Sequence, residues 1–278
     1  MEREIFRKGS TTYYWSSKFF PKSVRQDVFD LYSFVRLADD YVDAVPADSD
    51  GFYRLRRMWL EANKNIAFST KKLPDDTPDQ RVIKNIVRLV ERQGIKKQWV
   101  EVFLDTMQSD LVFHPKDTLE ESLKYTYGSA EVVGLMMAKI MDLSDQAQEA
   151  AQLQGRAMQW LNFIRDIAED NQMGRQYFPA EELRRFNLKD LSEGTATNQP
   201  QDFQKFMQFQ VERYKTWQRE SEAGYAYIPK RSRAPLQTAA DMYLWTADQI
   251  ERDPLVVYRK KVKPSKYRII HKLLTNMV

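Results

Sequence analysis

The stretch QWLNFIRDIAEDNQMGRQYFP, residues 159–179, decides the fold that the chain is expected to adopt. Asn162, Asp166 and Asp170 recur in it every four residues, a spacing that places them on one face of an α-helix. Carboxylates four residues apart repel each other by about a few tenths of a kcal/mol, so a helix that carries them gains from a cation between them. A solvated helix face is the alternative, because an apolar stripe covers roughly the opposite side: Leu153, Ala157, Trp160, Ile164 and Ala168.

A second acid pair occurs far upstream, in the stretch RLADDYVD over residues 36–43. Asp39 and Asp43 are again four residues apart, on an expected helix that is apolar on most of its sides and therefore typical of a buried helix. The two acids are expected to face an interior cavity, with Asp40 pointing about 100° away. Buried carboxylates are costly unless they are paired or bound to a metal. The structural alternative is that Arg36 and neighbouring lysines neutralise them.

Helical periodicity runs through almost the entire chain. The chain has only 9 glycines and no run of alternating β-branched residues between turn signals. Helices are predicted over residues 21–44, 51–68, 78–93, 97–111, 117–141, 145–173, 201–228 and 235–252. Residues 187–200 are polar and contain Gly194 and Pro200, so they are expected to form a loop. The pattern predicts an all-α fold, with one domain over residues 1–278.

Composition limits the chemistry that the chain can perform. The absence of cysteine excludes disulfides and thiolate metal sites, and the two histidines, His114 and His271, argue against a multi-histidine zinc site. A metal is therefore expected to be a hard cation on carboxylates, foremost Mg²⁺. The 15 Phe, 14 Tyr and 6 Trp suffice to line a large apolar pocket. A net charge of +4 is compatible with anionic ligands or a membrane surface and does not indicate nucleic acid.

The sequence contains no targeting or membrane-spanning signal. Residues 1–10 lack the apolar core of a signal peptide, and no apolar run approaches the roughly 20 residues that a membrane span needs. We expect a cytoplasmic protein, with peripheral membrane contact as the alternative. Residues 257–274 combine many lysines and arginines with apolar residues. Two interpretations stay open, a charged terminus that closes the bundle, which we favour slightly, and a basic helix at a lipid interface.

Two facing helices, each with an acid pair, predict metal-assisted diphosphate chemistry. Mg²⁺ ions bind to one or two carboxylates, keep several waters and take substrate phosphates as further ligands. The chain shows neither the motifs of a Ser-His-Asp hydrolase nor a P-loop.

Three sequence elements together resemble the squalene and phytoene synthase family, the head-to-head prenyl transferases. They are RLADDYVD at residues 36–43, YTYGSAEVVGLMM at 125–137 and NFIRDIAEDNQMGRQYFP at 162–179. The resemblance covers nearly the full chain and is strongest to bacterial and archaeal phytoene synthases. It implies an isoprenoid-synthase-type helical bundle around a central cavity.

The resemblance also assigns roles to residues. It implies that the metal ligands are Asp39, Asp43, Asp166 and Asp170. It implies that the substrate is bound by Arg36, Asn162, Arg165, Arg175 and Lys261. Arg36 and Arg165 would contact diphosphate or orient the acids, since guanidinium recognises phosphate oxygens well. The catalytic tyrosines that line the cavity would be Tyr32, Tyr127 and Tyr243, for which ordinary core packing is the alternative.

The chain departs from the family pattern at two places. Lys261, in VYRKKVKP, stands where the family often has an arginine followed by valine. Lysine keeps the charge but lacks the bidentate fork, and Arg259 is a candidate substitute. The N-terminal motif of the family is altered at residues 10–14, which keep hydroxyls and an aromatic ring.

The implied reaction joins two prenyl diphosphates through a cyclopropylcarbinyl diphosphate, with Mg²⁺, or alternatively Mn²⁺, as the cofactor. Small residues that leave room for long tails favour two geranylgeranyl diphosphates and phytoene: Ser17, Gly128, Ser129, Ala130 and Gly134. Bulky residues that shorten the cavity favour farnesyl diphosphate and squalene or dehydrosqualene: Phe19, Phe20 and Phe29. NADPH is expected only if the product is squalene. The general base stays unassigned between tyrosine hydroxyls and released diphosphate, and we expect a monomer.

Two other classes compete with this interpretation. Terpene cyclases and head-to-tail prenyl elongases usually carry DDxxD clusters, whereas both pairs here are DxxxD. A non-catalytic assembly protein of the same fold would be expected to lose the acids, and all four are present.

Overall fold

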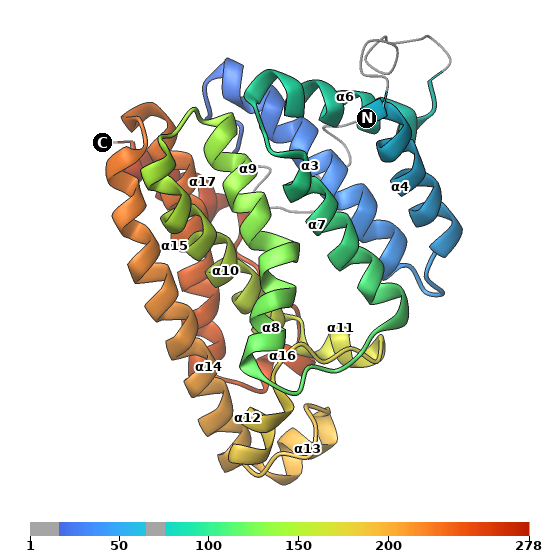
Figure 1. Cartoon of the computed structure of the whole chain (residues 1–278). Helices are drawn as coiled ribbons and strands as arrows, with labels where there is room; N and C mark the ends of the chain where they lie inside the picture. Colours follow the sequence, from blue (N-terminus) through green and yellow to red (C-terminus); the bar gives the residue numbers. More distant parts are fainter. Residues whose placement is uncertain (1–16, 65–75, 278) are drawn as a thin grey trace.

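The computed structural model describes residues 17–64 and 76–277. This part of the chain consists of helices joined by turns and loops, without a β-strand (Figure 1). The α-helices are α3 (Lys22–Asp43), α4 (Ser49–Lys64), α6 (Pro78–Gln93), α7 (Lys97–Ser109), α8 (Leu119–Thr126), α9 (Val132–Ile140), α10 (Gln148–Arg165), α11 (Ile167–Gln172), α12 (Ala180–Arg185), α13 (Glu193–Asn198), α14 (Pro200–Ser221), α15 (Lys230–Arg252), α16 (Val256–Arg259) and α17 (Lys266–Asn276). The predicted all-α fold is confirmed.

Local sequence signals set several of these boundaries. Helix α6 begins with a capping box, in which the Thr77 side chain accepts from the backbone N–H of Gln80 and the Gln80 side chain accepts from that of Thr77. It ends at Gly94, whose φ of 59° is the left-handed conformation that favours glycine. Thr118 and Glu121 form the same capping box at the start of α8.

Besides the helix predicted over 145–173, which is described with the site, three predicted segments differ from the structure. The helix expected over 117–141 is interrupted by a π-helical turn, η2 (Tyr127–Glu131). The expected loop over 187–200 contains α13, which Ser192 caps by accepting from the N–H of Thr195. Helix α14 ends at Ser221, and the chain continues as the 3₁₀ segment η4 (Glu222–Tyr227).

Two apolar cores stand side by side. The first is built mainly by α3, α4, α6, α7 and α9, around Phe34, Trp59 and Phe103. The second is built mainly by α10, α14 and α15 with the short helices that follow α10, around Trp160 and Tyr214. Figure 1 shows the two groups of helices on opposite sides, with α11, α12, α13 and α16 gathered at one end of the molecule. Each core buries its own large aromatic side chains, which leaves space between the cores for a cavity.

Glycines bring α10 into direct backbone contact with α9 and with the turn η2 beside this space. A Cβ atom on Gly134 would lie 2.2 Å from the carbonyl oxygen of Ala151, and one on Gly155 would lie 2.5 Å from that of Ala130. No side chain fits at either position unless the helices separate.

The C-terminal run does not form the single basic helix that one interpretation required. It divides into α16, a non-helical segment over residues 260–265, and α17, which packs on α15 with Ile269 and Leu273 buried. This arrangement favours a terminus that closes the bundle. None of the helices in the described ranges is both long and apolar enough to cross a bilayer.

Candidate active site

A cavity of about 560 Å³ lies between the two cores and is lined mainly by α3, α7, α9, α10 and α15. Its volume falls in the range of small-molecule sites, about 300–1,000 Å³. The carboxylates and cations gather at the end where α3 finishes and α10 passes into α11. The other end is apolar and is lined by Phe20, Met137, Met141, Ile228 and Leu236.

The acid pair on α3 faces this cavity. Asp39 and Asp43 line it, whereas Asp40 does not. Arg36 pairs with Asp39 at 2.7 Å and with Asp40 at 2.6 Å, so neutralisation by Arg36 is part of the arrangement. The Asp39 side chain is 34 % exposed, but it lines the cavity, so this area faces the cavity interior. Burial raises the pKa of Asp39 to about 7, and the charge of Asp43 adds to the effect more than Arg36 opposes it.

The second acid group lies opposite, at a break between two helices. The sequence pattern predicted one continuous helix, but α10 ends at Arg165, and Asp166 has φ −100° and ψ 13°. Arg165 donates from Nε and Nη2 to the two carboxylate oxygens of Asp166, at 2.8 and 2.6 Å. Adjacent residues of a regular helix do not face each other, and this bidentate pair accompanies the departure from helical geometry. Asn162, Asp166 and Asp170 all still line the cavity.

The pKa values of the two aspartates of this group, Asp166 and Asp170, shift in opposite directions. Burial would raise the pKa of Asp166, but Arg165 and Lys261 hold it below its usual value. Burial raises the pKa of Asp170 to about 8, and the charges of Asp166 and Asp43 reinforce the shift. At this charged end of the cavity, which we term the mouth, Asp39 and Asp170 therefore hold protons more readily than free aspartates do.

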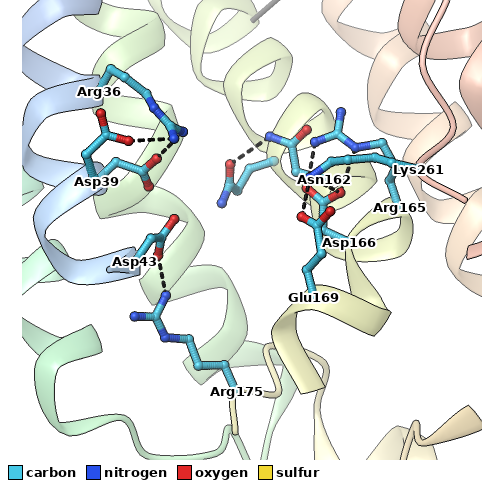
Figure 2. A network of polar contacts seen from close by, with 11 residues as sticks. Arg36, Asp39, Asp43, Asn162, Arg165, Asp166, Glu169, Arg175 and Lys261 are labelled. Atoms are coloured by element: carbon cyan, nitrogen blue, oxygen red, sulfur yellow. Dashed lines mark hydrogen bonds and ion pairs between the residues drawn. The ribbon is translucent and has the colours of Figure 1, made fainter. Parts of the chain in front are cut away.

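Cationic side chains pair with the acids of each group, as Figure 2 shows, and they line the same cavity. Arg175 donates from Nη1 to Asp43 at 2.5 Å and from Nη2 to the carbonyl oxygen of Val42 at 2.6 Å. Lys261 lies 3.1 Å from Asp166 and also pairs with Glu169. Arg175 thereby connects the loop after α11 to the end of α3.

Arg259 does not substitute for an arginine at position 261. It pairs with Asp253, and its side chain is 56 % exposed and outside the cavity lining. Lys261 is the residue of this segment that reaches the acids. The altered motif at residues 10–14 lies outside the described residues.

The tyrosines are only partly those expected. Tyr32 and Tyr243 line the cavity, and the Tyr243 hydroxyl donates to Asn162 Oδ1 at 3.3 Å. Tyr127 does not line it, because its half-buried ring packs against the first core. Tyr125 lines the cavity instead. Side chains two residues apart on a helix point about 200° away from each other, so the two tyrosines of YTYG do not share a face.

The sequence pattern did not identify Asp110. Its carboxylate accepts from the Tyr125 hydroxyl at 2.6 Å and from the Tyr177 hydroxyl at 3.4 Å. Burial raises its pKa to about 6, while Tyr125 and Arg175 favour the charged form. Phe103, Met107 and Asp110 follow one another at helical spacing and all line the cavity. The signal in the sequence that could have identified Asp110 is therefore an acid that continues an apolar stripe.

Only some of the residues expected to set the length of the prenyl tail line the cavity. Ser17, Ser129, Ala130 and Gly134 line the cavity. Gly128 does not, since a Cβ there would lie 1.8 Å from Thr106 Oγ1. Of the three bulky residues, Phe20 lines the cavity, Phe29 is buried in the first core and Phe19 is 41 % exposed.

The donor set fits magnesium shared with a phosphorylated ligand. No group of three or more acidic, histidine or cysteine side chains within the described ranges is arranged to hold a metal alone. Figure 2 shows why, because the acids of α3 and those of α10–α11 face each other from opposite sides. An ion on one or two carboxylates with phosphate oxygens and waters suits this separation. Burial and, after it, neighbouring carboxylates raise the pKa values of Asp39 and Asp170, and a bound cation would favour the charged form of both.

Known proteins with similar sequences and structures point to one family. The squalene/phytoene synthase family model matches residues 6–268. A 15-cis-phytoene synthase of Synechococcus elongatus is 27 % identical over 275 residues, which cover 93 % of this chain and 85 % of the relative. A phytoene synthase of Arthrospira platensis is 29 % identical over 278 residues, with the same coverage. A solved dehydrosqualene synthase in complex with a ligand superimposes with a TM-score of 0.83 at 25 % identity, covering 99 % of this chain and 93 % of that one. The chain belongs to the squalene/phytoene synthase family.

Proposed function

We propose that this chain joins two allylic prenyl diphosphates head to head through a cyclopropylcarbinyl diphosphate, and that two geranylgeranyl diphosphates give phytoene. The chain is a prenyl transferase by its family. The observation that carries the proposal is the polarity of the cavity, with charged groups at one end and apolar side chains at the other. A prenyl diphosphate has the same division.

The arginine and lysine side chains at the charged end of the cavity bind the diphosphate of the substrate. Arg36, Arg165, Arg175 and Lys261 all line the cavity, and each pairs with an aspartate here. A diphosphate competes for these cations, and guanidinium forks suit its oxygens. As the arginine and lysine side chains turn to the diphosphate, four carboxylates become available to Mg²⁺ or Mn²⁺, those of Asp39, Asp43, Asp166 and Asp170. When bound there, the metal acts as a Lewis acid on the leaving diphosphate.

The remaining lining protects and orients the carbocation. Aromatic faces stabilise a cation by about 0.5–2 kcal/mol each, and Tyr32, Tyr125 and Tyr243 place rings beside the charged end. The apolar walls exclude water that would quench the cation. Asp110 holds the Tyr125 hydroxyl by a hydrogen bond of 2.6 Å, which fixes the position of that ring.

The length of the cavity supports the longer substrate. Ala150 and Asp166 both line it, and 16 residues of helix span about 24 Å. Extended farnesyl and geranylgeranyl chains reach about 14 Å and about 19 Å, at about 1.25 Å of advance per carbon–carbon bond. The second candidate is condensation of two farnesyl diphosphates to squalene or dehydrosqualene, with NADPH required for squalene alone. It is favoured by the bulk of Phe20 in the wall and by the similarity to a dehydrosqualene synthase.

Aspartate-to-asparagine variants test the assignment of the acids. Asp39→Asn and Asp170→Asn should lower diphosphate release from geranylgeranyl diphosphate by at least about a hundredfold with saturating Mg²⁺, because each removes a metal-binding carboxylate. Asp40→Asn is the matched control, since Asp40 pairs with Arg36 outside the cavity, and it should stay within about threefold. Equal losses in all three variants would contradict the proposed roles.

A further inference from the structure

Lys263 is a cation of the cavity lining that the roles described above leave unassigned. It lies beside Lys261 in the lining, on the segment that joins α16 to α17. The other four cations of the mouth each pair with an aspartate. Lys263 makes no ion pair with any carboxylate of the part of the chain that the structure describes. An ammonium group that lines a cavity without a carboxylate partner is a candidate for binding an anionic ligand.

The backbone between α16 and α17 directs Lys261 and Lys263 to the same side. The segment is extended at both of its ends, with φ −163° and ψ 149° at Lys260 and φ −71° and ψ 154° at Ser265. Successive side chains of an extended chain point to opposite sides, and burial alternates accordingly. Val262 is buried in the second core, whereas the lysines before and after it are exposed. The buried valine holds the segment in place, and both lysines reach the mouth of the cavity.

Positive charge gathers around Lys263. Partial burial lowers the pKa of its ammonium group, and the charges of Lys261 and Arg165 lower that pKa further, against the attraction of Asp166 and Glu169. Lys261 already pairs with both of these acids, and Arg165 pairs with Asp166, as Figure 2 shows. These three cations therefore share these two carboxylates. An anion that arrives here relieves the repulsion among the cations.

Two ammonium groups at this spacing can bind one diphosphate. The Cα atoms of residues two apart in an extended chain lie about 7 Å from each other. The flexible four-carbon stem of lysine allows both ammonium groups to reach the same ligand. A diphosphate carries oxygens on two phosphorus atoms, so each ammonium group can contact its own phosphate. Hydrogen bonds between charged groups are about twice as strong as those between neutral groups.

We propose that Lys263 binds the diphosphate group of a prenyl diphosphate together with Lys261. The inference rests on the proposed function, because that function brings diphosphates to this cavity. The other cations of the mouth must exchange an aspartate for the ligand, whereas Lys263 gives up no carboxylate when it binds. Its contribution to the affinity is therefore expected both with and without Mg²⁺.

Calorimetric titration of the full chain with inorganic diphosphate tests the inference. Lys263→Met removes the charge and keeps an unbranched side chain, and it should weaken binding about tenfold, both with Mg²⁺ and after chelation of divalent cations. Lys263→Arg should bind diphosphate more tightly than Lys263→Met, because it restores the charge. The matched control is Lys260→Met, which removes an exposed lysine outside the cavity lining and should bind diphosphate as wild type does. Equal affinities of Lys263→Met and Lys260→Met, or no binding by wild type, would overturn the inference.

A double variant separates ligand binding from a structural role. A guanidinium fork offers from one position the two contacts that the lysines offer from two. Adding Lys261→Arg to Lys263→Met should therefore recover most of the lost affinity. A loss that Lys261→Arg leaves unchanged would assign Lys263 to the structure of its segment and overturn the inference. Thermal unfolding checks that Lys263→Met is folded, and Lys263→Gln replaces it if it is not, with the same tenfold loss expected.

Turnover of geranylgeranyl diphosphate by the same proteins keeps this inference apart from the proposed function. Lys263→Met should raise KM more than it lowers kcat, as loss of a contact made in the bound substrate requires. A fall in kcat with KM unchanged would overturn the binding role. Absence of hydrocarbon from every protein, wild type included, would contradict the proposed function, and the affinities for inorganic diphosphate would still decide the role of Lys263.

Discussion

Replacing Arg175 by glutamine should loosen the connection between the loop after α11 and α3. The Arg175 side chain is only 6 % exposed. It donates to Asp43 at 2.5 Å and to the carbonyl oxygen of Val42 at 2.6 Å. Its charge also lowers the pKa values of Asp110 and Asp170, which burial otherwise raises. The shorter neutral side chain removes both hydrogen bonds and the charge together.

The expected loss of stability follows from the burial of the Arg175 and Asp43 side chains. Breaking a buried ion pair by removing one partner costs about 3–5 kcal/mol. The Asp43 side chain is 34 % exposed, and water at that carboxylate screens part of the loss, so we expect about 2–3 kcal/mol. An unfolding entropy of about 2.1 cal/mol/K per residue over 278 residues gives about 0.6 kcal/mol/K, so Tm should fall by about 3–5 °C.

Thermal unfolding without divalent cations measures this effect. Arg175→Lys should recover part of the loss, because it keeps the charge without the fork. Arg259→Gln is the control, since it breaks a pair whose side chains are 56 % and 49 % exposed and should cost less than about 1 kcal/mol. If Arg175→Gln unfolds at the same temperature as Arg259→Gln, the contact of Arg175 with Asp43 and Val42 does not hold the loop after α11 to α3.

Three other perturbations address the interior of the cavity. Burial and like charges raise the pKa values of Asp39 and Asp170 to about 7 and about 8, so the folded protein keeps protons that the unfolded chain releases above about pH 4. The free energy of unfolding, measured by urea titration without divalent cations, should therefore fall from pH 4 to pH 8. A rise over that range would contradict this prediction. Tyr125→Phe should lower turnover about tenfold, whereas Tyr127→Phe should leave it within about twofold, and equal turnover in the two variants would count against the assignment. Ser17→Phe fills the apolar end and should shift product towards shorter chains; an unchanged ratio of geranylgeranyl to farnesyl use in a competition assay would contradict it.

The helical class and many helix ends could be predicted because they depend on local chemistry. The capping box of Thr77 and Gln80 and the left-handed Gly94 are encoded within a few residues of the boundaries that they set. The two acid pairs could be found for the same reason, since spacing along a helix fixes which side chains share a face.

The rest of the site depends on contacts that no short stretch encodes. Arg175 and Asp43 are 132 residues apart in sequence, so their pairing follows from the packing of the two cores. The break at Asp166 accompanies a side-chain pair with Arg165 that helical periodicity does not predict. The choice of Tyr125 over Tyr127 depends on which face of the segment formed by α8 and η2 lies against the cavity. Asp110 becomes recognisable only when Tyr125 and Tyr177 are brought to it.

Product analysis measures the head-to-head condensation itself. Purified protein with Mg²⁺ is given geranylgeranyl diphosphate or farnesyl diphosphate, with and without NADPH, and the extracted lipid is separated and identified by mass. We predict phytoene from geranylgeranyl diphosphate, independent of NADPH and lost when Mg²⁺ is chelated. No hydrocarbon from either substrate under any of these conditions would contradict head-to-head condensation by this chain.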